Sequence, residues 1–167
     1  MILLRGVHKS FGSQVVLDGV DLDVQEGETL ALLGPSGTGK SVLLKHIIGL
    51  IRPDSGTIMV DDEDVGRLRR KELAALRSRI GYVFQNGALF DSMNVLENVR
   101  LGITDQEKYR DEDYARERVA NCLKLVNLSP EVMMKFPAEL SGGMRKRVGI
   151  ARAIAGSPKY LLYDEPT

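Results

Sequence analysis

The 167-residue sequence contains no tryptophan, a single cysteine and no excess of charge of either sign. One cysteine, Cys122, excludes an intramolecular disulfide framework and fits a reducing compartment. The 23 basic and 23 acidic residues cancel, which argues against a partner attracted by bulk positive charge, such as duplex nucleic acid or an anionic membrane surface. No apolar run approaches the roughly 20 residues that span a bilayer, and the apolar start is too short for a signal peptide. We therefore expect a cytoplasmic chain in which any membrane role depends on a partner.

The composition is that of an ordinary globular protein. Hydrophobic residues make up 43% of the chain and charged residues 28%. At the usual scale of about 100 to 200 residues per domain, the length predicts one domain with a sizeable core, spanning residues 1–167. Because the sequence contains no internal repeat and no low-complexity segment, neither a repeat array nor disorder is expected.

The first part of the chain carries strand patterns and then a helix pattern. Apolar and acidic residues alternate from Val20 to Val24, as on a half-exposed strand, and the start of the chain looks antiparallel. Thr29–Leu33 is a short apolar run that predicts a strand buried on both faces of a parallel sheet. From Ser41 apolar residues recur with helical spacing as far as Gly49, a typical helix stop. Strand, glycine-rich loop and helix in this order are typical of a phosphate-binding segment.

The remaining patterns place further elements along the chain. Asp61–Asp64 form an acidic cluster that we interpret as a solvated turn, with a metal site as the alternative. The pattern from Gln85 to about Leu140 is helical. Elsewhere we expect strands over 57–60, 80–84 and 160–163, and helices over 71–77 and 142–155.

One face of a helix in this region is apolar. The cysteine lies on this face, which predicts that Cys122 belongs to the core. The apolar positions are Ala115, Val119, Cys122, Leu123 and Val126, and the residues expected mostly toward water are Arg116, Glu117, Arg118 and Lys124.

The glycine-rich segment fits the phosphate-loop pattern of Gly, four residues, Gly, Lys and Ser or Thr. Glycines let successive backbone N–H groups curl around phosphates, and the following helix presents its positive N-terminal end. Lys40 places a cation on the outer phosphates, and Ser41 can ligate Mg²⁺. A glycine-rich turn without a ligand is the alternative. The segment consists of Gly34, Pro35, Ser36, Gly37, Thr38, Gly39, Lys40 and Ser41.

Polar residues follow two of the predicted apolar strands. Asp164 and Glu165 come directly after the strand 160–163, at the end where open α/β sheets place ligands. Together with a phosphate loop, Asp164 is expected to hold Mg²⁺, directly or through water, and Glu165 to orient or deprotonate the attacking water. Gln85 ends another strand, where a neutral amide can bond both that water and the metal shell. The alternatives are helix-cap or surface positions for the carboxylates and a surface position for Gln85.

A second anion site precedes the helix over 142–155. Ser141 is a serine cap, and Gly142 and Gly143 leave backbone N–H groups unobstructed at the positive end of that helix. Two phosphate sites in one chain are redundant if a single chain holds a single nucleotide.

These segments, in this order, resemble the nucleotide-binding subunit of an ABC transporter. In that family the serine-glycine-glycine signature reaches across a head-to-tail dimer to the γ-phosphate held by the other subunit, which removes the redundancy. Phe11 matches the aromatic residue that stacks on adenine, although a lone aromatic could otherwise fill a strand or the core. Gly34–Ser41 match the Walker A loop, Gln85 the Q-loop, Ser141–Gly143 the signature and Tyr160–Glu165 the Walker B strand.

The resemblance implies a fold, cofactors and partners. The fold is α/β, a P-loop NTPase with a mainly parallel core sheet, an N-terminal antiparallel β subdomain and a helical signature subdomain over about residues 86–155. ATP and Mg²⁺ are bound, and ATP hydrolysis powers transport. The partners are a second copy of the chain and an integral membrane permease, not nucleic acid, so the chain is expected on the inner face of the cell membrane, attached through the permease.

A narrower resemblance points to a substrate class. Met144, where the commonest signature has Gln, and the segments 41–50 and 85–93 are similar to ATPases of the Mla type. Those ATPases serve phospholipid-trafficking systems that contain MCE proteins. The resemblance therefore implies transport of phospholipid or another lipid.

The membrane partner is expected to dock beside the Q-loop. Leu89, Phe90, Met93 and Val95 offer apolar side chains beyond what a short loop needs. The alternative is that these residues pack the helical subdomain's own core.

Two other functions remain open from the sequence. One is an ABC-type ATPase that moves no solute, against which the lack of a long coiled coil and of a basic stripe argues. The other follows from the end of the sequence at Thr167, before the family's D-loop and switch histidine. His8 and His46 do not occupy the switch position, and His46 is expected to be a packed or half-exposed helix residue. The chain therefore resembles a C-terminally truncated subunit that binds MgATP but hydrolyses it little.

Overall fold

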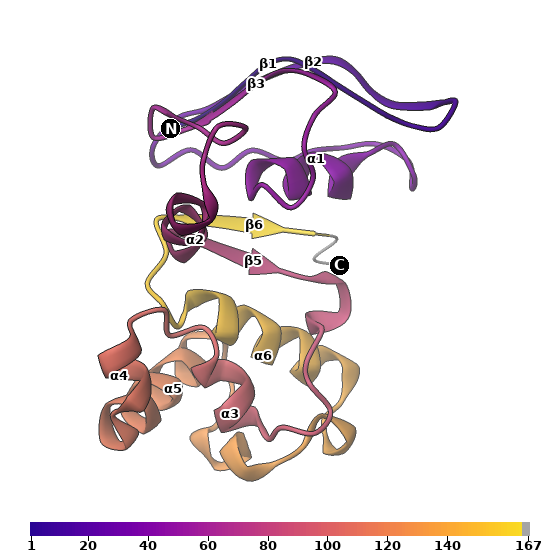
Figure 1. Ribbon diagram of the computed structural model, residues 1–167. Helices are drawn as coiled ribbons and strands as arrows, with labels where there is room; N and C mark the ends of the chain where they lie inside the picture. The colour runs from indigo at the N-terminus through magenta and orange to yellow at the C-terminus, as the bar shows by residue number, and fades with distance from the viewer. Residues whose placement is uncertain (165–167) are drawn as a thin grey trace. The chain divides into compact units, whose positions relative to one another are not determined.

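The computed structural model describes residues 1–164, apart from the side chain of Asn86. The chain divides into two compact units, of which unit 1 is Met1–Arg77 and unit 2 begins at Ser78 (Figure 1). Each helix in residues 1–164 is too short or too polar to cross a lipid bilayer.

Unit 1 contains a four-stranded antiparallel sheet in the order β2-β1-β3-β4. β1 is Ile2–Phe11, β2 is Gln14–Val24, β3 is Ser55–Val60 and β4 is Glu63–Asp64. The strands predicted over 20–24 and 57–60 and the antiparallel start are therefore confirmed. Apolar residues of these strands form one buried face of the sheet, as the alternation of side chains along a strand requires. Its fully buried members include Leu4, Val7, Ile58 and Val60.

β1 and β3 approach each other closely at a pair of glycines. Gly56 has φ +91°, and a Cβ atom there would lie 2.3 Å from the carbonyl oxygen of Gly6. The register between the two strands shifts in this part of β1, as at a β-bulge. Only glycine fits at this close approach, so Gly56 fixes the alignment of the two strands. The same alignment pairs Ile2 with Val60 at the other end of the strands.

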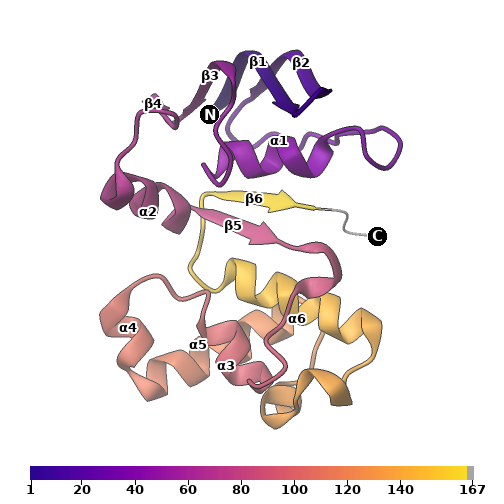
Figure 2. The same cartoon turned by 45° about the vertical axis from the view of Figure 1, so that its right-hand side comes forward.

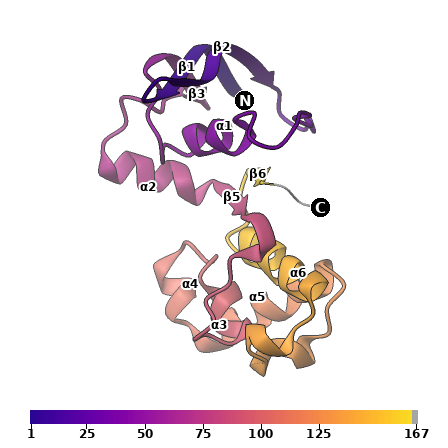
Figure 3. The ribbon, with the colours of Figure 1, turned by 90° about the vertical axis from the view of Figure 1, so that its right-hand side faces the viewer.

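Two helices complete unit 1. α1 is Lys40–Ile47 and α2 is Arg70–Ser78. α1 lies beside the sheet of this unit (Figures 2 and 3). Arg77 on α2 donates from Nε to the carbonyl oxygen of Ile48 and from Nη2 to that of Gly49, at 2.9 and 3.0 Å, and so caps the end of α1. The predicted stop at Gly49 is confirmed, and the apolar face of α1 is buried together with His46.

His46 has one satisfied ring nitrogen. Its Nδ1 lies 2.7 Å from the carbonyl oxygen of Val42, one turn earlier in α1. The side chain is fully buried, which confirms the packed position expected for it.

The strand predicted over Thr29–Leu33 is wrong, because this segment is irregular and exposed in the structure, with Leu33 92% exposed. The sheet of unit 1 does not include this segment. A parallel strand forms only where a neighbouring strand offers an open edge, and an apolar run alone cannot specify that neighbour. The predicted acidic turn is confirmed at Asp61 and Asp62, which both have positive φ, and the following two residues form β4.

Unit 2 combines a parallel strand pair with helices. The pair joins β5, Ile80–Val83, to β6, Tyr160–Tyr163. The remaining elements are α3 Val95–Arg100, α4 Gln106–Arg110, α5 Glu112–Leu125, α6 Gly142–Ile154 and the 3-10 helices η1 Gln85–Gly87, η2 Pro130–Met134 and η3 Pro137–Glu139. The strands and helices predicted in this part of the chain are confirmed, and α6 packs against β5 (Figure 2).

The core of unit 2 lies where α3, α5 and α6 meet. Val119, Cys122 and Leu123 of α5 are fully buried there, and burial raises the pKa of the Cys122 thiol. The apolar face predicted for α5 is therefore confirmed, with Val126 half-buried at its end.

Arg118 differs from the prediction that it points mainly toward water. It donates from Nε to the carbonyl oxygen of Ala155 at 2.9 Å and from Nη2 to that of Ile154 at 2.8 Å. Nη2 also donates to the Ser157 hydroxyl at 2.8 Å. Arg118 thus satisfies the last carbonyl groups of α6, which have no partners within the helix.

Candidate functional site

The glycine-rich loop before α1 is held by its own polar groups. The Lys40 ammonium donates to the carbonyl oxygens of Gly34 and Pro35 at 2.7 and 2.8 Å. The Thr38 hydroxyl donates to the Pro35 carbonyl oxygen at 2.9 Å. Lys40 therefore bridges the two ends of the loop, and its charge lies at the loop itself.

Glycine is required where the loop joins α1. Gly39 is the N-cap of α1 with φ +90°, and a Cβ atom there would lie 2.9 Å from the carbonyl oxygen of Val16. The first turn of α1 contains no acidic residue, and no side chain caps it. Because the first N–H groups of a helix have no intrahelical partners, this end of α1 favours an anion.

Phe11 belongs to the same unit as the loop and is 49% exposed at the end of β1. It pairs with Gln14 of β2, two residues before Val16, the residue on which Gly39 packs. The Lys9 ammonium lies 5.4 Å from the centroid of the Phe11 ring. The register thus places an exposed aromatic ring on the part of the sheet that supports the loop.

Asp164 and Gln85 lie at one edge of the parallel pair in unit 2. Val83 of β5 pairs with Tyr163 of β6, so Asp164 and the segment starting at Gln85 both follow the carboxyl ends of adjacent strands. The backbone N–H of Asp164 donates to the Val83 carbonyl oxygen at 3.0 Å. Glu165, predicted as the catalytic base, lies outside the described residues.

Tyr82 is a residue of this edge that sequence reasoning missed. Its hydroxyl donates to Oδ2 of Asp164 at 2.9 Å. Burial, and then the Asp164 carboxylate, raise the pKa of Tyr82, so its hydroxyl stays protonated and keeps donating. Since Tyr82 pairs with Leu162, its side chain shares a sheet face with residue 164. Alignment of the two predicted strands could have indicated this contact.

The second predicted anion site forms the N-terminus of α6. Ser141 is the N-cap, and its hydroxyl oxygen accepts from the Met144 N–H at 3.3 Å, which confirms the predicted serine cap. Gly142 and Gly143 are exposed, and a Cβ atom on Gly143 would meet nothing within 4 Å. Arg145 donates to the Leu140 carbonyl oxygen at 2.7 Å, and the first turn of α6 lacks acidic residues.

The predicted residues therefore form three groups. Phe11 and Gly34–Ser41 are in unit 1, while the Gln85–Asp164 edge and the Ser141 end of α6 are in unit 2. The donors expected for Mg²⁺, namely Ser41, Gln85 and Asp164, are all oxygen donors. This chemistry fits a hard cation that is shared with phosphate oxygens.

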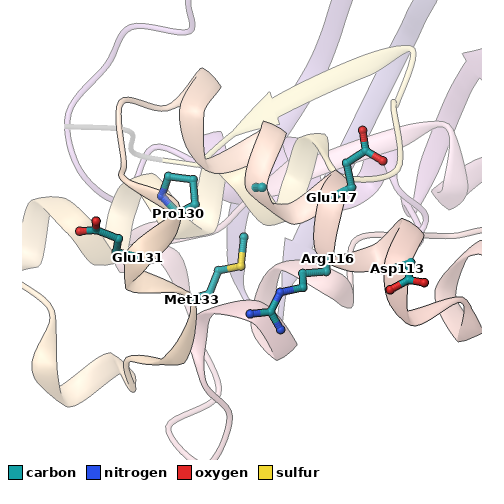
Figure 4. Close-up of a pocket in the computed structure, with 7 residues that line it drawn as sticks. Asp113, Arg116, Glu117, Pro130, Glu131 and Met133 are labelled. Carbon is teal, nitrogen blue, oxygen red and sulfur yellow. The ribbon is translucent and has the colours of Figure 1, made fainter.

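A separate open cavity of about 530 Å³ lies between α5 and η2. Figure 4 shows charged side chains around it and Met133 at its wall. None of the predicted site residues lines it. The lining residues are Asp113, Arg116, Glu117, Ala120, Pro130, Glu131 and Met133.

Comparison with known proteins adds three findings. A family profile described as "ABC transporter" matches residues 17–167. The chain is 46% identical over 165 residues to a "Probable ribonucleotide transport ATP-binding protein mkl" of Mycobacterium leprae, covering 99% of this chain and 47% of that protein. It is 45% identical to the "Sulfate/thiosulfate import ATP-binding protein CysA" of Rhodopseudomonas palustris, covering 99% of this chain and 46% of that protein. The chain thus spans slightly less than half the length of these curated relatives.

Among solved structures, the chain is similar to the ATP-binding cassette MJ0796 in a dimeric, post-hydrolysis state bound to ADP and Pi. The identity is 37%, the TM-score is 0.89, and the match covers all of this chain and 75% of that one.

Proposed function

We propose that this chain, which belongs to the ABC transporter family, binds and hydrolyses ATP to power a membrane transporter. Its α/β fold is that of the ABC ATPase cassettes, which are P-loop NTPases. The observation that carries the proposal is the glycine loop itself, with the Lys40 ammonium held against it at the uncapped positive end of α1.

The roles follow from the chemistry of each group. Backbone N–H groups of Gly34–Ser41 bind the phosphates, Lys40 neutralises the outer phosphates and Phe11 stacks on the adenine. Ser41, Asp164 and Gln85 are the residues that would hold Mg²⁺, which when bound would neutralise charge on the phosphate oxygens. Gln85 orients the attacking water, and Glu165 orients or deprotonates it. Tyr82 keeps Asp164 in place by its hydrogen bond.

The Ser141 end of α6 gives a reason to propose a homodimer. Its exposed glycines and serine cap offer a second anion site outside unit 1. In a head-to-tail dimer this site on one copy meets the γ-phosphate on the glycine loop of the other. ATP then favours dimer formation, because it is shared between the two copies.

The loop after Gln85 supports docking of an integral membrane permease. Asn98 is fully buried, and its side-chain amide accepts from the Phe90 N–H and donates to the carbonyl oxygens of Phe90, Met93 and Asn94, at 2.8 to 3.1 Å. This network fixes the loop with the Phe90 ring 54% exposed. Leu89 and Val95 instead pack the core, so the alternative of core packing applies to those two residues. Phe90 and the half-buried Met93 remain the proposed docking residues.

Phe90→Glu is expected to abolish assembly with the permease while leaving the fold intact, because a carboxylate would replace an exposed apolar ring at a desolvated contact. Recovery of the membrane protein in an affinity purification of the tagged chain measures the effect. Leu125→Glu, at a position 71% exposed on α5, is the matched control and should assemble normally. Normal assembly of Phe90→Glu would contradict docking at this loop.

The transported solute is proposed to be phospholipid or another lipid. The support is the likeness of Met144 and of residues 41–50 and 85–93 to Mla-type ATPases. The relatives' names instead cover ribonucleotide, sulfate or thiosulfate, and methionine, so the solute differs between relatives of similar identity. With an integral membrane permease as its partner, the chain is proposed to lie at the inner face of the cell membrane.

Purification of the tagged chain in mild detergent tests this proposal. The expected result is an integral membrane protein in fixed ratio to the chain, with phospholipid extracted from the complex by organic solvent and identified by mass spectrometry. A membrane protein without bound lipid would contradict the lipid assignment alone. Recovery of ribosomes or DNA in place of a membrane protein would instead favour a non-transport ATPase.

A further inference from the structure

The segment that carries Gln85 packs directly on the backbone of α6. A Cβ atom on Gly149 of α6 would lie 2.7 Å from the Cα atom of Gly87. A Cβ atom on Gly87 would lie 2.6 Å from the carbonyl oxygen of Arg145, also on α6. The two backbones therefore touch with no side chain between them, and η1 is seated on the middle of α6.

Arg152 binds the same segment from a position three residues after Gly149, nearly one turn further along α6. Its Nη2 donates to the carbonyl oxygen of Gly87 at 2.7 Å, and its Nη1 donates to that of Ala88 at 2.9 Å. Ala88 has φ +41°, a left-handed conformation that residues with a side chain adopt only when their surroundings hold them there. The guanidinium is partly buried, which lowers the pKa of Arg152 and strengthens its hydrogen bonds.

A guanidinium suits this task better than an ammonium. It is planar and presents two N–H donors in a fixed fork, which matches two successive carbonyl oxygens. A lysine keeps the charge but cannot hold both oxygens in this geometry. The contact therefore depends on the shape of Arg152 and not only on its charge.

We propose that Arg152 is a positioning residue, whose guanidinium locks the backbone after Gln85 to α6 so that Gln85 and the Ser141 end of the same helix move as one piece. For ATP hydrolysis this inference rests on the proposed function. A phosphate bound at Ser141 then acts on the position of Gln85 through one rigid helix. In the proposed dimer, that linkage connects the nucleotide held by the partner copy to the hydrolytic site of this copy.

Amide hydrogen exchange of the whole chain tests the lock without any nucleotide. The Gly87 N–H donates to the Phe84 carbonyl oxygen at 3.0 Å, and exchange over residues 84–90 reports the opening of this turn. In Arg152→Lys, we expect exchange over 84–90 to rise at least tenfold, while exchange over 154–158 stays unchanged.

Arg118→Lys is the matched control, because Arg118 also donates to two backbone carbonyl groups, those of Ile154 and Ala155 at the C-terminal end of α6. It should accelerate exchange over 154–158 and leave 84–90 unchanged. Unchanged exchange over 84–90 in Arg152→Lys would overturn the proposal. Equal acceleration of both segments by both variants would overturn it too, since that pattern reports general loosening.

MgATP turnover tests the route through Gln85. Arg152→Lys should lower kcat about tenfold and leave the KM for MgATP within about twofold. In a Gln85→Ala background the same substitution should not lower kcat any further. Additive losses would overturn the positioning role and leave the proposed function in place. Absence of turnover in the unsubstituted chain would count against the proposed function, and the exchange result would still decide the role of Arg152.

Discussion

Replacing Lys40 with alanine is expected to weaken MgATP binding by about two orders of magnitude, which corresponds to about 2.7 kcal/mol. The ammonium is the only group of the loop with a full positive charge, and its bonds to phosphate oxygens are charge-assisted. The same substitution removes the bridge to the carbonyl oxygens of Gly34 and Pro35, so the loop also loses order. Isothermal titration calorimetry on the whole chain measures the affinity.

The control for this prediction lies on the same helix. Lys45→Ala removes the same charge from the last turn of α1, away from the loop, and should leave the affinity for MgATP within about twofold. Circular dichroism of both variants checks that α1 persists. Equal affinity of Lys40→Ala and the unsubstituted chain would refute phosphate binding by this loop, and no binding by the folded unsubstituted chain would refute the proposed nucleotide site.

Replacing Asn98 with alanine is expected to destabilise unit 2 by about 3 kcal/mol. The substitution deletes an amide that satisfies one N–H and three carbonyl groups of the loop 90–94. Because the site is fully buried, water cannot replace the lost bonds without opening the loop. The loss exceeds that of a single hydrogen bond, since the Phe90 N–H and the Met93 carbonyl group both lose the side-chain amide, whereas the carbonyl groups of Phe90 and Asn94 still accept from backbone N–H groups.

Tyrosine fluorescence isolates this effect during urea unfolding. All five tyrosines of the chain lie in unit 2, and the chain has no tryptophan, so the signal reports unit 2 alone. Asn121→Ala, at an exposed position of α5, is the control and should shift stability by less than about 0.5 kcal/mol. A midpoint for Asn98→Ala equal to that of the control would show that the network contributes nothing to stability.

The local features of the site were predictable because they depend on neighbouring residues. Gly39 and Ser141 are residue types that are favoured at the N-cap of a helix. In the structure α1 and α6 begin directly after them. The alternation within β1, β2 and β3 likewise indicates which face is buried. These signals need no knowledge of what lies elsewhere in the chain.

The features that could not be predicted join residues far apart in the sequence. Arg152 meets Gly87 and Ala88 more than 60 residues away, and Arg118 meets Ala155. A side chain that bonds to backbone groups leaves no pattern in its partner, because every residue carries a carbonyl group. The strand predicted over 29–33 was wrong for the same reason. Strand formation depends on a neighbouring strand elsewhere in the chain, and an apolar run does not identify that neighbour.

The close pairing of β1 with β3 has a consequence for how the protein is made. Ile2 pairs with Val60, and this pairing closes a long loop of chain that contains Phe11 and all of Gly34–Ser41. During synthesis the β1–β2 hairpin can form early, but the central pairing must wait until Val60 has emerged from the ribosome. Unit 1 ends only 17 residues later, at Arg77, so its sheet can close before most of unit 2 has emerged from the ribosome. The phosphate loop therefore reaches its folded surroundings on the nascent chain, ahead of the segments that carry Gln85, Ser141 and Asp164.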